Sequence, residues 1–328
     1  MVDQAHGVSG QRGTGAAWLH RLAVLTAWAT LTLIFIGGLV TSTGSGLAVP
    51  DWPLSFGQLF PRMAGGVLYE HGHRMAAAFV GLLTTVLAVW MWLKEPRAWL
   101  RGLAAAALLA VLLQGVLGGI TVLFLLPIAI SVAHASVAQA FFCLTVALAV
   151  FTGPGWEGPA RTSARGSRSP LPRLCAATTA VVYLQLVLGA VMRHMGAGLA
   201  IPDFPLAFGR LVPPLDAPGV LIHFLHRVGA VVVTACVLWT LACVVRRHAE
   251  EPRLLRPAVG AAGLVAVQLA LGALTIWTSR AVLPTTAHVA VGAAVLASSL
   301  VLTLRSYQLA GEPRPSVRGG LLSEQVAA

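Results

Sequence analysis

Apolar runs long enough to cross a lipid bilayer recur eight times along this 328-residue chain. A helix needs about 20 residues to span the hydrocarbon core, and inside lipid its backbone hydrogen bonds must be made within the helix. With 57% hydrophobic and 10% charged residues, the chain falls outside the composition of soluble domains and of disordered segments. The sequence therefore predicts an all-α membrane protein with eight transmembrane helices, at residues 20–40, 71–93, 101–125, 130–151, 174–193, 219–245, 255–278 and 285–305.

Lysine and arginine residues are unevenly divided between the two sides of this topology. With the N-terminus in the cytoplasm, 16 of the 22 fall in inner segments and 6 in outer segments. Cytoplasmic loops of membrane proteins collect Lys and Arg in this way, so the formal charge of +11 requires no nucleic-acid partner. We expect a multi-pass protein of the cell (plasma) membrane, surrounded by the lipid bilayer, with both termini cytoplasmic.

The second half of the chain repeats the first. GSGLAVPDWPLSFGQLFP at 44–61 matches GAGLAIPDFPLAFGRLVP at 196–213 in 12 of 18 positions, and QGVLGGITV at 114–122 matches QLALGALTI at 268–276. Each half holds four predicted helices, an even number, so both halves enter the membrane in the same direction. The sequence therefore predicts two tandem four-helix bundles related by a pseudo-twofold axis along the membrane normal.

The duplication also sets the expected domain boundaries. The N-terminal four-helix half covers 18–152, after a cytoplasmic tail at 1–17, and the C-terminal half covers 173–308. Residues 153–172 are rich in Gly, Pro, Ser and Arg, which is typical of a flexible linker. We expect this linker and the tail at 309–328 in the cytoplasm.

The first repeated segment forms an outer loop of each half, and its prolines and glycines predict a rigid loop over the outer face. Asp51 and Asp203 occupy equivalent positions in this loop. We expect both to have a turn or capping role, because Asp side chains in turns accept hydrogen bonds from nearby backbone N–H groups.

Four of the ten histidines occupy matched positions: His73 with His226, and His134 with His288. Each lies near the start of a helix that runs from outside to inside, so the four imidazoles should share one depth near the outer surface. Two imidazoles on neighbouring helices of a four-helix bundle can ligate a haem iron from both sides. Zinc is disfavoured, because two histidines per half leave its tetrahedron incomplete. We therefore expect one haem site per half, with these histidines as axial ligands.

Other polar residues near the four histidines allow more than one role. Arg74 and Arg227 each follow a matched histidine, and either pair with a haem propionate or extend to lipid headgroups. His71, His194 and His223 have no histidine at the matching place in the other half. For these three we expect hydrogen-bonding or packing roles rather than ligation.

The halves differ one helical turn outside the first ligand. Glu70 precedes His73 by three residues, whereas His223 precedes His226. Residues three apart share a helix face, so Glu70 lies close to any ring that His73 binds and can move protons or hold an intermediate. Its alternative role is structural, as an acid near a helix N-terminus or as a partner of an outer arginine. The asymmetry predicts that one haem is chemically changed while the other carries electrons.

The Glu-x-x-His-Arg motif, the two ligand histidines per half, the eight spans and the duplicated loop together resemble the haem A synthase family, over residues 18–308. The resemblance implies an oxidoreductase, a haem O monooxygenase, which converts the methyl at ring position 8 by successive hydroxylations and loss of water into the formyl of haem A. It further implies that His73 and His134 hold the substrate haem O, with Glu70 as the catalytic residue, and that His226 and His288 hold haem b.

The same resemblance implies three partners: haem O synthase as the supplier of substrate, the cytochrome oxidase assembly machinery as the receiver of haem A, and an unidentified electron donor. Many bacterial members carry a pair of cysteines in the first outer loop, but residues 41–69 contain none, which excludes a thiol–disulfide role there. The four cysteines of this chain lie in or beside apolar segments, and we expect them to be small apolar core residues.

Two other functions remain open at this point. A b-type cytochrome that passes electrons from quinol through two bis-histidine haems would hold them at different depths, whereas all four matched histidines fall on one side. A transporter with parallel repeats would need broken helices and polar groups at mid-depth. Few ionisable residues lie in the middle of the spans, so we rank the transporter third.

Overall fold

The computed structural model describes residues 4–156 and 170–311, with side chains within 15–156 and 170–310. The described helices are α1 (Gln4–Ser42), α2 (Gly66–Lys94), α3 (Ala98–Leu123), α4 (Ile128–Thr152), α5 (Leu171–His194), the 3₁₀ turn η1 (Ala197–Leu199), α6 (Pro218–His248), α7 (Pro252–Trp277) and α8 (Val282–Gly311). Eight of these are long and apolar enough to cross a membrane. This confirms the predicted all-α class and its eight spans, so the chain is a multi-pass membrane protein.

Several helices continue beyond the predicted spans. α1 begins at Gln4 rather than near residue 20, so helix covers part of the predicted tail, and α6 continues to His248. Hydropathy marks only the part of a helix that is suited to lipid. The backbone hydrogen bonds continue into polar sequence until a proline, a glycine or a turn ends them.

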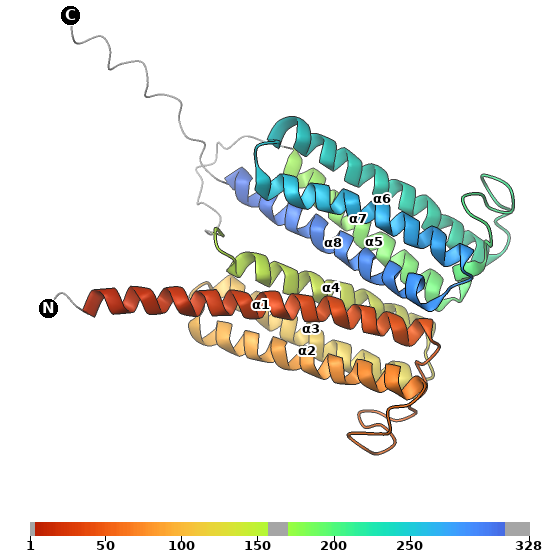
Figure 1. The fold of residues 1–328 in the computed structure, drawn as a ribbon, viewed down its shortest axis with the longest axis horizontal. Helices are drawn as coiled ribbons and strands as arrows, with labels where there is room; N and C mark the ends of the chain where they lie inside the picture. Colours follow the sequence, from red (N-terminus) through yellow and green to blue (C-terminus); the bar gives the residue numbers. More distant parts are fainter. Residues whose placement is uncertain (1–3, 157–169, 312–328) are drawn as a thin grey trace, which may run out of the picture.

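Helices α1 to α4 lie together in one part of the molecule, and α5 to α8 lie together in the other (Figure 1). Within each group, every helix contacts the next one, and the first also contacts the fourth. A buried cluster in the N-terminal half draws on all four of its helices, with Leu19, Leu87, Leu100 and Phe141 among its members. This packing is compatible with two four-helix bundles.

The two groups of helices pack against each other through α1, α4, α5 and α8. Phe142 and Val146 of α4 are buried there against Ala293 of α8. The predicted domain boundaries at 152 and 173 stay predictions, since residues 157–169 of the expected linker lie outside the described residues.

The long loops at 43–65 and 195–217 lie at the same end of the molecule, opposite the start of α1 and the end of α8 (Figure 1). Each loop leads into the helix that carries the first matched histidine of its half, α2 or α6. All four matched histidines lie within the first turns of their helices, near this end.

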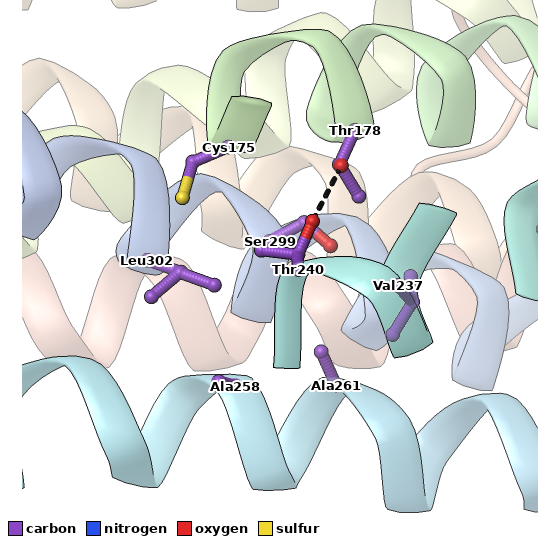
Figure 2. A pocket seen from close by; sticks show the side chains of 8 residues that line it. All are labelled: Cys175, Thr178, Val237, Thr240, Ala258, Ala261, Ser299 and Leu302. Carbon is purple, nitrogen blue, oxygen red and sulfur yellow. Dashed lines mark hydrogen bonds between the residues drawn. The ribbon is translucent and has the colours of Figure 1, made fainter. Parts of the chain in front are cut away.

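A small pocket lies deeper in the C-terminal half, between α5, α6, α7 and α8 (Figure 2). The hydroxyl groups of Thr178 and Thr240 form a 2.9 Å hydrogen bond across it. Ser299 and Cys175 also line the pocket, together with Val237, Ala258, Ala261 and Leu302. The lining includes no imidazole and no charged side chain, so this pocket does not provide the predicted ligands.

Candidate functional site

Each matched histidine lies against a glycine of the preceding helix. A Cβ atom built on Gly37 of α1 would lie 3.0 Å from Cε1 of His73, and one on Gly189 of α5 would lie 2.9 Å from Cε1 of His226. The second histidine of each half repeats the arrangement with α3 or α7, because a Cβ on Gly118 would lie 3.4 Å from Cε1 of His134, and one on Gly272 3.2 Å from Cε1 of His288. The absence of a side chain at these four positions lets the imidazoles lie close to a helix backbone inside the protein.

The histidines of one half face each other. The ring centroids of His226 and His288 are 6.4 Å apart, with 66° between the ring planes. A metal-bound imidazole nitrogen lies about 2.0 Å from the ion, and its ring centre lies about 1 Å further out. Two imidazoles on opposite sides of one ion therefore have centroids about 6 Å apart, so this pair fits a shared iron. His73 and His134 are likewise within electrostatic range of each other.

The hydrogen bonding of the imidazoles differs between the halves. Nδ1 of His73 and Nδ1 of His134 are buried without a hydrogen-bond partner among the described residues. In the other half, Nδ1 of His226 lies 3.1 Å from Nε2 of Gln185, and Nδ1 of His288 lies 3.1 Å from the carbonyl oxygen of Gln268. Unpartnered buried polar atoms are costly and mark places where a further group can bind.

A repeated glutamine holds the second histidine of each half, and sequence reasoning missed it. Nε2 of Gln114 donates to the carbonyl oxygen of His134 at 3.0 Å, and Gln268 contacts the imidazole of His288. Both glutamines begin the repeated segments at 114–122 and 268–276, and the glycines that contact the histidines stand four residues later. The duplicated glutamine and glycine, four residues apart, are therefore visible in the sequence as a signal for this contact.

The aspartates of the two outer loops have the predicted turn role. Asp51 accepts hydrogen bonds from the backbone N–H groups of Phe56 and Gly57 at 2.7 and 2.8 Å. Asp203 accepts the equivalent pair from Phe208 and Gly209 at the same distances. The hydrogen bond from the N–H group of Gly57 has the largest effect on the pKa of the Asp51 carboxyl, and that from Phe56 the next largest. Both lower this pKa below its ordinary 3.8. These contacts keep each loop folded.

The two repeated arginines fasten these loops to the helices. Nη1 of Arg74 donates to the carbonyl oxygens of Asp51 at 2.7 Å and Leu54 at 2.8 Å. Arg227 repeats this pattern, with Nη2 donating to the carbonyl oxygen of Asp203 at 2.7 Å and Nη1 to that of Leu206 at 2.8 Å. From the sequence, we expected these two arginines to contact a haem propionate or lipid headgroups. Their contacts with carbonyl groups of the loop were not expected.

Glu70 is buried between its own helix and the loop. Its Oε2 accepts the backbone N–H of Val49 at 2.8 Å, and its Oε1 accepts Nη2 of Arg74 at 2.6 Å. His223 stands at the equivalent position, where its Nδ1 accepts the N–H of Ile201 at 3.2 Å. Glu70 and His223 therefore bind equivalent backbone N–H groups of the two loops. The halves differ at this place because only the N-terminal half has a carboxylate there.

The other two unmatched histidines lie near the outer ends of their helices, His71 on α2 and His194 on α5. Nδ1 of His71 forms a 2.8 Å hydrogen bond with Oγ of Ser55 in the outer loop. His194, at the end of α5, is within electrostatic range of His134, so the C-terminal half contributes a side chain near the N-terminal site.

No group of three or more His, Cys, Asp or Glu side chains within the described ranges could hold a metal ion by itself. The four cysteines are free thiols. A site built from two facing imidazoles fits an iron whose other ligands come from a macrocycle. The assignment of the four histidines as haem ligands stays a prediction.

Comparison with known proteins identifies the family. A family model described as "Cytochrome oxidase assembly protein", COX15-CtaA, matches residues 63–300, most of the chain. The chain belongs to the COX15-CtaA family. The match begins just before Glu70 and includes all four matched histidines, so it covers both halves of the duplicated site.

Among curated relatives, the heme A synthase of Symbiobacterium thermophilum is 34% identical over 268 residues, covering 78% of this chain and 85% of that protein. The heme A synthase of Halalkalibacterium halodurans is 30% identical and covers 87% of this chain and 96% of that protein. The heme A synthase of Alkalihalophilus pseudofirmus is 32% identical over 67% of this chain and 75% of that protein. The similarity therefore extends over three quarters or more of the length of these relatives.

Proposed function

We propose that this chain is a haem A synthase, a membrane oxidoreductase that oxidises a methyl group of haem O to the formyl group of haem A. The observation that carries the proposal is the duplicated pair of inward histidines, each against a glycine, with a carboxylate beside only one pair. The relatives named heme A synthase, which match most of the chain, support it.

In this proposal His73 and His134 hold the substrate haem, and His226 and His288 hold haem b. The 6.4 Å separation of the second pair fits two ligands on one iron, and the imidazoles of the first pair have no hydrogen-bond partner at Nδ1 among the described residues. When bound, haem b supplies iron redox chemistry. The protein holds and orients the ligands, and the low polarity around them excludes water.

Glu70 is the group that moves a proton beside the substrate. Held by Arg74 and by the N–H of Val49, it can pass on the protons that each hydroxylation with molecular oxygen consumes together with two electrons. His223 carries no carboxylate at the equivalent position, which leaves the second haem chemically unchanged.

An apolar groove beside the first site suits the isoprenoid tail of haem O. The groove lies between α1 and α2 and is lined by Ile36, Leu33, Ala76, Phe79 and other apolar residues. Ile36 neighbours Gly37, and Ala76 is one turn from His73. In the C-terminal half, Gln185 and Gly229 stand at the positions of Leu33 and Ala76, and the amide of Gln185 lies over Gly229. The groove therefore belongs to the half that is proposed to take the substrate.

The proposal includes partners and a location. Each hydroxylation with molecular oxygen consumes two electrons, so an electron donor is needed, and haem O synthase must supply the substrate. The product passes to the cytochrome oxidase assembly machinery, in line with the family. The placement of 16 of 22 basic residues on one side supports a plasma-membrane protein with cytoplasmic termini, whose histidines lie near the outer face.

The test is the production of haem A in cells that lack their own haem A synthase and express this chain together with haem O synthase. The wild-type chain should yield extractable haem A. Glu70→Gln can still accept the N–H of Val49, so it should keep its haem b while the rate of haem A formation falls roughly 100-fold or more, the usual effect of removing a proton-transferring group.

The matched control is His223→Gln, which changes the equivalent loop contact of the other half and should leave haem A formation within a factor of about three, a range that a neutral hydrogen bond covers. A wild-type chain that binds only haem b and forms no haem A would support the b-type cytochrome instead. Full activity of Glu70→Gln would remove Glu70 from the mechanism.

A further inference from the structure

Two arginines distinguish the outer end of the C-terminal half from its duplicate. Arg193 is in the last turn of α5, and Arg280 follows the end of α7. At the equivalent positions the N-terminal half has Thr41 and Leu126. Arg280 and Leu126 lie beside equivalent glycines, since a Cβ on Gly198 would lie 3.8 Å from Cδ of Arg280, and one on Gly46 would lie 3.4 Å from Cδ1 of Leu126. The C-terminal half therefore carries two positive charges at positions where the N-terminal half has none.

Arg193 lies on the face of α5 that contacts the second histidine pair. It lies four residues after Gly189, which contacts His226, so the two residues share one face of α5. Its guanidinium is within electrostatic range of the imidazole of His288. Nη2 donates to the carbonyl oxygen of Gly38 at 3.0 Å and to Oγ of Ser42 at 2.8 Å. Nε is buried and has no hydrogen-bond partner among the described residues.

No anion in the described part of the chain balances these charges. The ion pairs formed there join Glu70 to Arg74, Glu95 to Arg97 and Glu251 to Arg253, and none includes Arg193 or Arg280. The two guanidinium groups are nevertheless within electrostatic range of each other. Arg280 is exposed, whereas the Nε of Arg193 is buried without a partner among the described residues. A buried unpartnered N–H is unfavourable, and an anion bound beside Arg193 would remove that cost.

The two propionates of a haem are carboxylates on one edge of the macrocycle, and guanidinium groups bind carboxylates well. We propose that Arg193 and Arg280 bind the propionates of the haem held by His226 and His288 and thereby retain it as a resident cofactor. This rests on the proposed function. The N-terminal half has neither cation and releases its haem as product. The duplicated sites therefore differ in how firmly they hold haem as well as in the carboxylate of Glu70.

The test uses the full-length protein, purified with its haem, and compares wild type with Arg193→Gln, Arg280→Gln and the double variant. Three properties are measured: the rate of haem b transfer to an excess of an apoprotein acceptor, the midpoint potential of the haem, and thermal unfolding. Loss of a charge-assisted hydrogen bond should speed haem loss roughly tenfold for each arginine. The midpoint potential should fall, because a nearby cation favours the reduced iron. Arg193→Lys should restore part of both effects.

Arg210→Gln is the matched control, because it removes an exposed outer-loop arginine and should change neither haem loss nor potential. In the reverse experiment, Thr41→Arg with Leu126→Arg should slow the release of haem from the N-terminal half. If the glutamine variants unfold more easily but keep the wild-type potential and haem-loss rate, Arg193 only joins α5 to α1 and the inference is wrong.

An effect confined to the binding of vesicles containing anionic lipid, with unchanged potential, would assign the arginines to headgroups and also overturn the inference. The two proposals can fail separately. A wild-type protein without haem b removes the proposed function together with this inference. A wild-type protein that holds haem b, with variants that hold it equally well, removes only the role of the arginines.

Discussion

The contact between Gly189 and His226 allows a substitution whose effect can be worked out from the structure. In Gly189→Ala the new Cβ would lie 2.9 Å from Cε1 of His226. Carbon atoms in favourable contact are about 3.5–4.0 Å apart, so the imidazole must move by about 0.6 Å or more. Crowding of this kind typically costs about 1–3 kcal/mol. Because the imidazole is a proposed iron ligand, that cost should appear in the affinity for haem b.

Each 1.4 kcal/mol corresponds to a tenfold change in a binding constant, so the affinity for haem b should fall roughly 5- to 100-fold. The fold itself should weaken less than haem binding, because without iron the imidazole is free to move aside and Ala is favoured over Gly inside a helix by up to about 1 kcal/mol. The assay is the haem b content and the low-spin absorption of the purified protein, compared with its thermal unfolding in the absence of haem.

Gly260→Ala on α7 is the control, because nothing lies within 4 Å of a Cβ built there. Gly260→Ala has the same gain in helix propensity as Gly189→Ala, and this variant should keep its haem. Gly118→Ala, with a contact of 3.4 Å to His134, should have a smaller effect on the first site. If Gly189→Ala binds haem b as tightly as Gly260→Ala, the imidazole of His226 is not fixed as a ligand, and the reasoning from the glycine contacts is wrong.

Three further predictions concern the loops, the cysteines and the groove. Because backbone N–H groups lower the pKa of Asp51 and Asp203 below 3.8, the loop contacts should persist above that pH and be lost as the pH falls through the lowered pKa. Hydrogen exchange at Phe56 and Gly57 reports this, and loss of protection near neutral pH would contradict it. Cys143→Ala and Cys236→Ala should leave haem content and haem A formation unchanged, and a loss of either would show that the thiols act in the reaction. Ala76→Phe should fill the groove and raise the KM for haem O while leaving haem b bound, and an unchanged KM would place the isoprenoid tail elsewhere.

The parts of the molecule that repeat along the chain were predictable from the sequence. The eight spans follow from hydropathy, and the four histidines and the aspartates of the loop turns follow from the duplication. The positions of Asp51 and Asp203 could be interpreted because their partners, five and six residues away, lie in the same turn.

The sequence offered an outer arginine as a partner of Glu70, and Arg74 is that partner. The contacts of Glu70 and Arg74 with the loop could not be predicted in this way. They depend on how the loop folds back on α2, which brings Val49 to a residue 21 positions later in the chain. The sequence placed Glu70 and His223 at equivalent positions, but their equivalent loop contacts, with Val49 and with Ile201, depend on the same folding of the loop. The position of Arg193 depends on its hydrogen bonds to Gly38 and Ser42 of α1, a contact between the halves that a sequence pattern does not contain.

The most direct test of the duplicated histidine sites is the electron paramagnetic resonance spectrum of the purified oxidised protein, recorded for wild type, His226→Ala and His288→Ala. The account predicts a low-spin signal of an iron with two imidazole ligands in the wild type, and its loss in both variants. His248→Ala, at the opposite end of α6, should keep the signal. A wild-type preparation without such a signal, or variants that retain it, would contradict the assignment of these histidines as haem ligands.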